Sequence, residues 1–278
     1  MILVTGTKRS GTSMWMQVLV ASELPYIGEP YMGAWEDSIK AANPNGFYES
    51  PLRQGIFYGT NPHPQTGAFL FPRQTRTHVV KVFVPGLVRT DYAYIDHVVA
   101  TMRSWREYGR SLHRLYELED AWFASHEPDK AAELQAKAAR SRSKLPPAVE
   151  WWFENYDLIR DIATRRYKVN LTSYDRMLRD PEPVVRQVFA WLGAGDADKA
   201  LQAIEPKLRS QRQQDDGDLG VSAEHAAVMD ELYHTVDQGQ ALSGGLLQKL
   251  NTVQEQMAEE HGRLSRERSR EDEPAPGG

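Results

Sequence analysis

Cysteine is absent from this chain of 278 residues. Its absence excludes disulfide bonds, thiolate ligands for zinc and thiol nucleophiles, and suits a reducing compartment. The chain also lacks a run of about 18 apolar residues, the length that a helix needs to cross a bilayer. No basic and apolar leader precedes the first strand pattern at 2–5. The sequence therefore predicts a cytoplasmic protein without a membrane partner.

An excess of basic residues is missing as well. Lys and Arg number 33 against 38 Asp and Glu, which gives a formal net charge of -5 at pH 7. This balance gives no reason to expect a nucleic-acid partner. Apolar residues make up 41% of the chain, as in ordinary globular proteins. Any site for an anion must therefore come from basic residues that gather locally.

Short apolar runs alternate with helical patterns along the chain. Runs at 2–5, 78–84, 94–101 and 167–172 predict buried strands. Strands that alternate with helices predict an α/β protein with a P-loop-type three-layer fold, in which helices flank a central parallel sheet. Residues 25–75 are rich in Pro, Gly, Asn and Tyr, which predicts loops and short helices covering a site.

The same patterns divide the chain into a main domain and two C-terminal segments. Residues 1–221 are expected to form the main domain, with an exposed helical excursion at 119–146 where Ala, Lys, Glu, Arg and Gln dominate. Residues 222–262 have a helical composition without a sustained heptad, which argues against a stable coiled coil. Residues 263–278 contain almost no apolar side chains and predict a disordered tail.

The most informative segment is the phosphate loop at 6–13, which reads Gly-Thr-Lys-Arg-Ser-Gly-Thr-Ser. Gly6 and Gly11 have the spacing of a P-loop, but Thr12 stands where that motif needs Lys. Backbone N–H groups and hydroxyls at a helix N-terminus can still hold an anion. The candidate anion-binding residues are Lys8, Arg9, Ser10, Gly11, Thr12 and Ser13.

This loop resembles the 5′-phosphosulfate loop of sulfotransferases that use PAPS (3′-phosphoadenosine-5′-phosphosulfate), in which Lys or Arg precedes Ser-Gly-Thr-Thr/Ser. The resemblance covers about 2–195 and is strongest to bacterial members, which carry Asn-Pro-x-Gly-aromatic-aromatic-Glu after the loop. Here that segment is 43–49. The resemblance implies a sulfotransferase domain over 1–221, PAPS as donor, PAP as product and no metal. It also implies that Arg9 contacts the phosphosulfate and stabilises the bridging oxygen.

A second pair of residues fits the same resemblance. The family binds the 3′-phosphate of PAPS with an Arg at a strand end and a Ser eight positions later. Arg103 follows the apolar run at 94–101, and Ser111 lies eight positions further on. A guanidinium fork and a hydroxyl suit a phosphate dianion. The resemblance therefore implies that these two residues bind the 3′-phosphate.

Sulfuryl transfer also needs a base for the acceptor proton. In the small-molecule branch of the family the base is the His of a Lys-Thr-His-Leu-Pro segment. Residues 81–85 read Lys-Val-Phe-Val-Pro, so Phe83 replaces the His and only Lys81 keeps a charge-stabilising role. Other branches use a Glu about one helix and one loop after the phosphate loop. Glu29 is therefore the first choice of base, and Glu49 is the second.

Two other functions stay open at this point. A P-loop kinase or other NTPase would bind ATP with Mg²⁺, but it needs Lys after Gly11. A non-catalytic scaffold would bind PAP without turnover, although the presence of Arg9, Lys81, Arg103 and Ser111 favours catalysis. The acceptor is a small molecule, a glycan or a peptide with a hydroxyl or amine, and the sequence does not choose among them.

Overall fold

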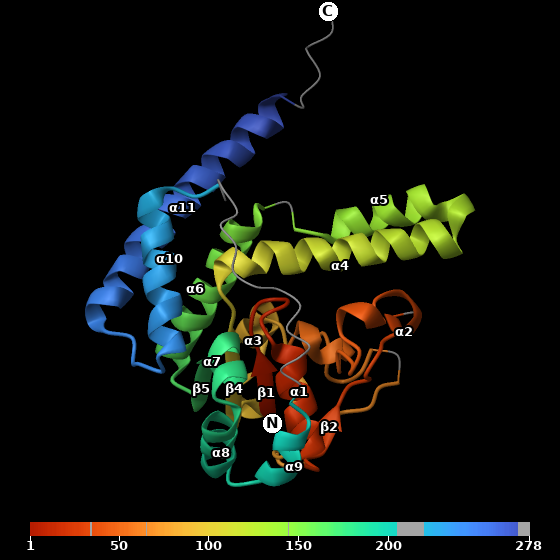
Figure 1. The fold of residues 1–278 in the computed structure, drawn as a ribbon, viewed down its shortest axis with the longest axis vertical. Coiled ribbons are helices and arrows are strands. Elements are labelled where there is room, and N and C mark those ends of the chain that lie inside the picture. The colour runs from red at the N-terminus through yellow and green to blue at the C-terminus, as the bar shows by residue number, and fades with distance from the viewer. Residues whose placement is uncertain (34, 65, 144, 205–219, 272–278) are drawn as a thin grey trace, which may run out of the picture.

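A five-stranded parallel sheet forms the centre of the protein in the computed structural model (Figure 1). The structure describes residues 1–33, 35–64, 66–143, 145–204 and 220–271. The strands are β1 (Ile2–Thr5), β2 (Tyr26–Ile27), β3 (Val79–Lys81), β4 (His97–Met102) and β5 (Val169–Ser173). Their order across the sheet is β2-β3-β1-β4-β5, which confirms the predicted α/β fold with a central parallel sheet.

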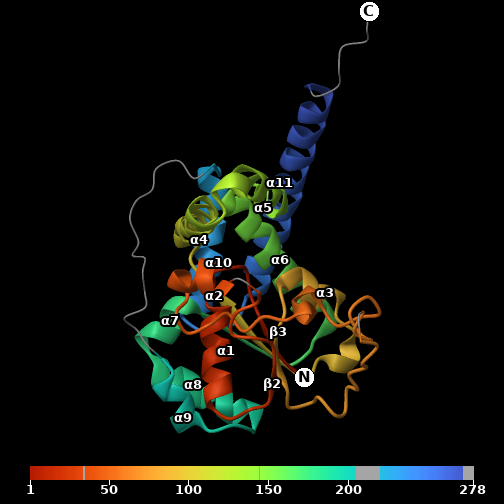
Figure 2. The ribbon, with the colours of Figure 1, turned by 90° about the vertical axis from the view of Figure 1, so that its right-hand side faces the viewer.

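Helices cover both faces of this sheet (Figure 2). The main flanking helices are α1 (Thr12–Ala21), α3 (Val84–Arg89), α6 (Pro147–Arg165), α7 (Tyr174–Arg179), α8 (Pro181–Leu192) and α9 (Ala197–Gln202). Ile2 and Val4 pack against the face covered by α1 and α8, whereas Leu3 packs against the opposite face with α3 and α6. Because both faces of each central strand are buried, the strands read as continuous apolar runs.

The chain leaves β3 earlier than its apolar run suggests. The run at 78–84 predicts one strand that stops at Pro85 and Gly86, but β3 ends at Lys81 and α3 begins at Val84. Pro85 lies in the first turn of α3, where a missing N–H costs nothing. Gly86 packs against backbone, since an added Cβ would lie 2.6 Å from the carbonyl oxygen of Arg53.

The helical excursion is the outer part of a hairpin that projects from the body in Figure 1. Its helices are α4 (Trp105–His126) and α5 (Ala131–Ser141), joined by the short turn at Pro128–Lys130. The smaller elements of the loop region are α2 (Trp35–Ser38) and the 3₁₀ turns at Lys40–Ala42 and Pro51–Gln54, and a further 3₁₀ turn at Tyr92–Tyr94 lies between α3 and β4. The segment at 25–75 therefore consists mainly of loops, as predicted, although it also contributes the edge strand β2.

The C-terminal segment forms two helices, α10 (Ala223–Asp237) and α11 (Gly244–Glu271), which pack against α6. α11 extends to Glu271 and so includes part of the segment from 263 for which the sequence predicts a disordered tail. Arg and Glu dominate the sequence there, and both have a high helix propensity. Residues 272–278 lie outside the described residues. Within the described ranges, no helix has both the length and the apolar character that a membrane crossing requires.

Candidate active site

The phosphate loop joins β1 to α1 and depends on glycine at both of its ends. Gly6 has a φ of 151°, and a Cβ there would lie 2.3 Å from the carbonyl oxygen of Thr101. Gly11 has a φ of 102°, and a Cβ there would lie 2.7 Å from the ring of Tyr174. Only glycine combines these dihedrals with such close approach. The loop therefore lies directly against β4 and the start of α7.

Ser10, one of the predicted anion-binding residues, forms hydrogen bonds that give it a structural role instead. The hydroxyl of Ser10 is buried and donates to the carbonyl oxygen of Thr7 at 2.7 Å. The hydroxyl of Thr101 donates to the carbonyl oxygen of Ser10 at 3.0 Å. Ser10 does not line the neighbouring cavity, whereas Gly11, Thr12 and Ser13 do. Ser10 therefore stabilises the loop itself.

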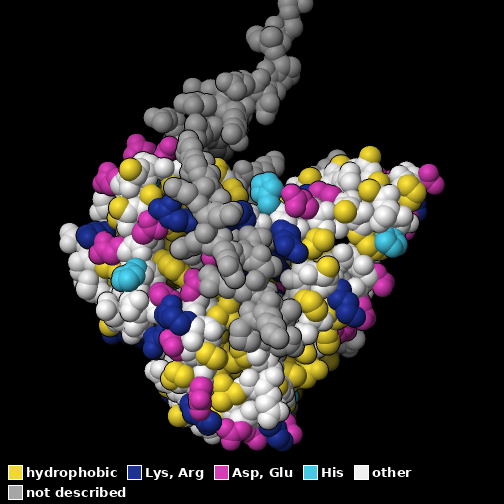
Figure 3. Space-filling view, in the orientation of Figure 1, with side chains coloured by type: hydrophobic (Ala, Val, Ile, Leu, Met, Phe, Trp, Pro, Cys, Tyr) yellow, Lys and Arg dark blue, Asp and Glu magenta, His cyan; other side chains and the backbone are white. Residues whose placement is uncertain are grey.

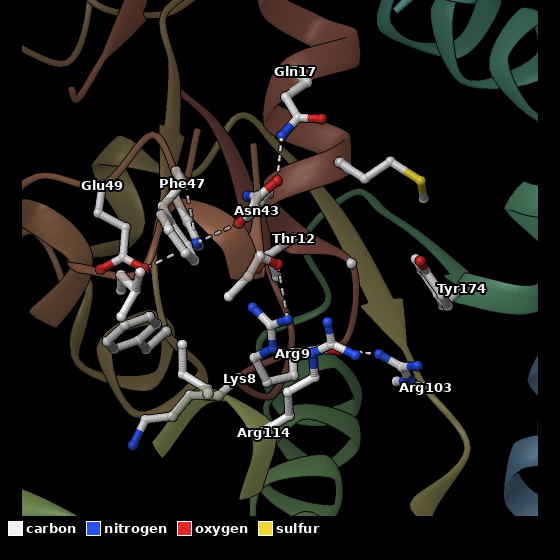
Figure 4. Close-up of a pocket in the computed structure, with 18 of the residues that line it drawn as sticks. Lys8, Arg9, Thr12, Gln17, Asn43, Phe47, Glu49, Arg103, Arg114 and Tyr174 are labelled. Atoms are coloured by element: carbon white, nitrogen blue, oxygen red, sulfur yellow. Dashed lines mark hydrogen bonds and ion pairs between the residues drawn. The ribbon is translucent and has the colours of Figure 1, made fainter. Parts of the chain in front are cut away.

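A cavity of about 620 Å³ lies beside the phosphate loop (Figure 4). Carboxyl ends of neighbouring parallel strands meet at this edge of the sheet, where ligands bind in open α/β folds. The described basic residues that line it are Lys8, Arg9, Arg53, Lys81, Arg103, Arg114 and Arg142, and the acidic ones are Glu49 and Glu119. Elsewhere, Figure 3 shows basic and acidic side chains interspersed over the visible surface. The cavity is therefore a local concentration of positive charge that suits an anionic ligand.

Arg9 lies at the centre of this positive charge. Its Nε donates to the hydroxyl oxygen of Ser111 at 3.2 Å, and its Nη2 donates to the carbonyl oxygen of Ala42 at 3.2 Å. Burial, with help from the charges of Arg103 and Arg114, lowers the pKa of Arg9 to about 10. The guanidinium still carries its charge at neutral pH.

Arg103 and Ser111 lie together beside the loop. The Nη1 of Arg103 donates to the hydroxyl oxygen of Ser111 and to the carbonyl oxygen of Arg9, both at 3.2 Å. Its Nε and Nη2 donate to Glu107 at 3.2 and 3.1 Å, and its guanidinium lies 4.9 Å from the ring centre of Tyr174. The two residues that the sequence placed eight positions apart thus share one hydrogen-bond network with the phosphate loop.

The other end of the cavity contains a buried carboxylate between two cations. One oxygen of Glu49 accepts from Nζ of Lys81 at 3.0 Å, and the other accepts from Nη1 of Arg53 at 2.7 Å. Lys81 also donates to the hydroxyl of Ser13 at 3.1 Å and to the carbonyl oxygen of Phe47 at 3.2 Å. Burial lowers the pKa of Lys81, while the neighbouring carboxylate opposes this effect. We call this part of the cavity, around Glu49 and Lys81, the mixed-charge end. The hydrogen bond from Lys81 to Ser13 links it to the phosphate loop.

Glu29, the first choice of base from sequence, does not reach this cavity. Its side chain is exposed and is not part of the cavity wall. Its backbone instead pairs with the backbone of Glu49, with N–H to oxygen distances of 2.9 and 3.1 Å. Distance along an irregular segment could not decide which Glu side chain turns inward. Of the two predicted bases, only Glu49 lines the cavity.

The run at 43–49 is a turn that presents Glu49 to the cavity. The side-chain amide of Gln17, on α1, donates to the side-chain oxygen of Asn43 at 3.1 Å and to the carbonyl oxygen of Gly46 at 2.9 Å. The side-chain amide of Asn43 donates to the same carbonyl at 2.6 Å. The Asn and Gly of this segment therefore have a structural role, and Glu49 at its end is the carboxylate that lines the cavity.

Sequence reasoning missed several residues of the cavity wall. Arg53 lies four positions after Glu49, a spacing that favours an ion pair within a helical turn. Arg114 lies three positions after Ser111 and therefore shares its face of α4. Arg142 comes from the excursion and forms ion pairs with Glu119 and Asp120 of α4. The first two had a usable spacing signal, whereas only the hairpin packing brings Arg142 to the site.

Lys8 is shared between the cavity and the helix behind it. Its Nζ lies 3.9 Å from a carboxylate oxygen of Glu150, a buried residue of α6. Because it also lines the cavity, Lys8 is placed to act on a ligand at the loop.

The fold is α/β, and a cavity lined largely by cations lies beside a loop and a helix N-terminus, a combination that suits an anion. No model of a known protein family matches the chain. A search of curated proteins also found no match. A function must therefore be argued from the site, because a fold of this class hosts many unrelated activities.

Proposed function

We propose that the protein is a sulfotransferase that moves a sulfuryl group from PAPS to a hydroxyl or amine acceptor, with Glu49 as general base. The observation that carries this proposal is the buried pair of Glu49 and Lys81 beside the phosphate loop. A proton acceptor and a cation thus meet where the anionic group of a donor would lie. The lack of cysteine supports placing this activity in the cytoplasm.

The donor end supplies hydrogen-bond donors, which is the chemistry that a phosphosulfate needs. The N-terminus of α1 and the side chain of Arg9 would hold the 5′-phosphosulfate. Arg103 and Ser111 would hold the 3′-phosphate. Ser111 already accepts from both guanidinium groups, so its own O–H proton is available for donation to a phosphate oxygen.

The transfer is a single in-line displacement at sulfur. The acceptor oxygen or nitrogen forms a bond to sulfur while the bond from sulfur to the bridging oxygen breaks, and PAP leaves with the electron pair. Glu49 takes the acceptor proton. Arg9 and Lys81 stabilise the negative charge that develops on the bridging oxygen. The acceptor becomes a sulfate ester or a sulfamate.

Glu49 replaces Glu29 as the proposed base because of its position. Each oxygen of Glu49 accepts one hydrogen bond from a cation, and each carboxylate oxygen has two lone pairs. A lone pair therefore remains for the acceptor proton. Phe83 also lines the cavity, but a phenyl ring cannot accept a proton.

The test is calorimetry of the purified protein with PAP and, separately, with ATP and Mg²⁺, followed by PAPS turnover with phenols, sugars and tyrosyl peptides. We expect PAP to bind with a Kd of about 1 μM, close to -8 kcal/mol. Tighter binding of ATP with Mg²⁺ would overturn the proposal in favour of a kinase or NTPase. Binding of PAP without turnover of PAPS would favour the scaffold function.

A further inference from the structure

The cations that line the cavity are unevenly neutralised. Five of the seven form an ion pair with a carboxylate, namely Lys8, Arg53, Lys81, Arg103 and Arg142. Arg9 and Arg114 form no such pair with any described residue. Within the described part of the chain, two guanidinium groups of the cavity wall therefore have no carboxylate counter-charge.

These two cations lie at the same end of the cavity. Arg114 lies on α4 three positions after Ser111, and Ser111 accepts a hydrogen bond from Arg9. The charge of Arg114 also acts on Arg9, where it adds to the effect of Arg103. Figure 4 shows the guanidinium groups of Arg9, Arg103 and Arg114 beside one another. Two of the three cations thus donate to the hydroxyl oxygen of Ser111, and Arg114 lies three positions along α4 from that residue.

Such a cluster repels itself unless a ligand supplies negative charge. Glu107 pairs with Arg103, so the protein neutralises one of the three cations. Because Arg9 would hold the 5′-phosphosulfate, Arg114 is the cation without a described carboxylate partner that remains for a second anionic group of the donor.

Arg114 has more guanidinium N–H groups available to a phosphate than Arg103 has. The Nε and Nη2 of Arg103 are held by Glu107, which leaves its Nη1 edge for other partners. Arg114 is exposed, lines the cavity and forms no hydrogen bond through its side chain with any described residue. A guanidinium without other partners can donate two parallel hydrogen bonds to a phosphate.

We infer that Arg114 is a specificity-determining residue, which binds the terminal phosphate monoester of the donor nucleotide together with Arg103 and Ser111. The inference rests on the proposed function, since it assigns Arg114 to the 3′-phosphate of PAPS. Arg114 then discriminates a nucleotide that carries this phosphate from one that lacks it.

The experiment compares PAP with AMP, which lacks the 3′-phosphate, by calorimetry on four proteins: wild type, Arg114→Gln, Arg114→Lys and Lys137→Gln. Lys137 lies on α5, is exposed and does not line the cavity, so its substitution is a charge-matched control. We expect Arg114→Gln to weaken PAP about 10- to 100-fold, as for loss of a charged hydrogen bond. AMP affinity should change less than about twofold, because AMP makes no contact there. Arg114→Lys should recover part of the loss, since it keeps the charge without the fork.

An unchanged PAP affinity in Arg114→Gln would overturn this inference while leaving the proposed function intact. An equal loss for PAP and AMP would also overturn it, because Arg114 would then act on the whole site. If wild-type protein binds no PAP, the proposed function and the inference fail together. Thermal unfolding of each variant shows whether it folds, and the ratio of PAP to AMP affinity in Arg114→Lys provides the test if Arg114→Gln does not.

Discussion

The cavity has a cationic end around Arg9 and Arg103 and a mixed-charge end around Glu49 and Lys81. At the cationic end the functional groups come from the exits of β1 and β4 and from α4, which are regular elements. At the mixed-charge end the carboxylate comes from the irregular segment at 25–75 and meets a lysine at the end of β3. Under the proposed function, the sheet edge positions the residues that hold the donor, whereas the irregular segment carries the proposed base.

Arg9→Ala is expected to have the largest effect, since the proposed function assigns Arg9 both to donor binding and to charge stabilisation. We expect kcat/KM for PAPS to fall by about 10³-fold or more, because removing one preorganised donor to developing charge typically costs 10²–10³ in kcat. Turnover assays with an accepted acceptor measure this. Arg9→Lys is the control that keeps the charge, and activity of Arg9→Ala near that of wild type would contradict the assigned role.

Glu49→Gln should separate the two ends of the cavity. We expect turnover to fall by about 10²-fold or more, the usual contribution of a general base, while PAP affinity stays nearly the same. Glu29→Gln is the matched control, because the same change is made on an exposed side chain outside the cavity. Full activity in Glu49→Gln together with loss in Glu29→Gln would restore the assignment from sequence.

Arg103→Ala should weaken PAP binding by about 1.5–3 kcal/mol, as for a charged hydrogen bond. It should also destabilise the fold, because the buried Glu107 would lose its cation. Calorimetry and urea unfolding measure the two effects separately. The double variant with Glu107→Gln should recover stability but not PAP affinity. Recovery of both would show that Arg103 acts only through folding.

The smallest predicted effect is the pH dependence of stability that comes from Glu154, on α6 behind the cationic end. Burial, together with the charge of Glu150, raises the pKa of Glu154 from 4.5 to about 7. The folded protein then binds more protons than the unfolded chain between these values, so its stability falls as pH rises from about 4.5 to 7. We expect Glu154→Gln to be more stable than wild type by about 1–2 kcal/mol at pH 8 and equally stable at pH 4.

Urea unfolding at the two pH values checks this prediction. Glu259→Gln is a suitable control, because Glu259 is exposed on α11, away from the pair on α6. Equal stability of wild type and Glu154→Gln at pH 8 would show that Lys8 neutralises the pair of carboxylates in full.

The strands of the sheet were predictable because buried strands require continuous apolar runs in the sequence. Continuous apolar runs predicted four of the five strands, while the two-residue edge strand β2 is too short to show any period. The end of β3 was misplaced for a related reason. Val82 and Val84 are buried after the strand ends, so apolar character continues into the turn and α3.

The sequence by itself determined the parallel α/β fold and the position of the phosphate loop, because glycine spacing and strand burial are local requirements. The resemblance to sulfotransferases also indicated Arg103 and Ser111, because that family carries an Arg at this strand end and a Ser eight positions later. Only the tertiary structure decided between Glu29 and Glu49, which are paired through their backbones with one side chain exposed and the other buried. Irregular backbone has no period that links position in the chain to direction in space, so side-chain orientation there depends on packing between distant segments.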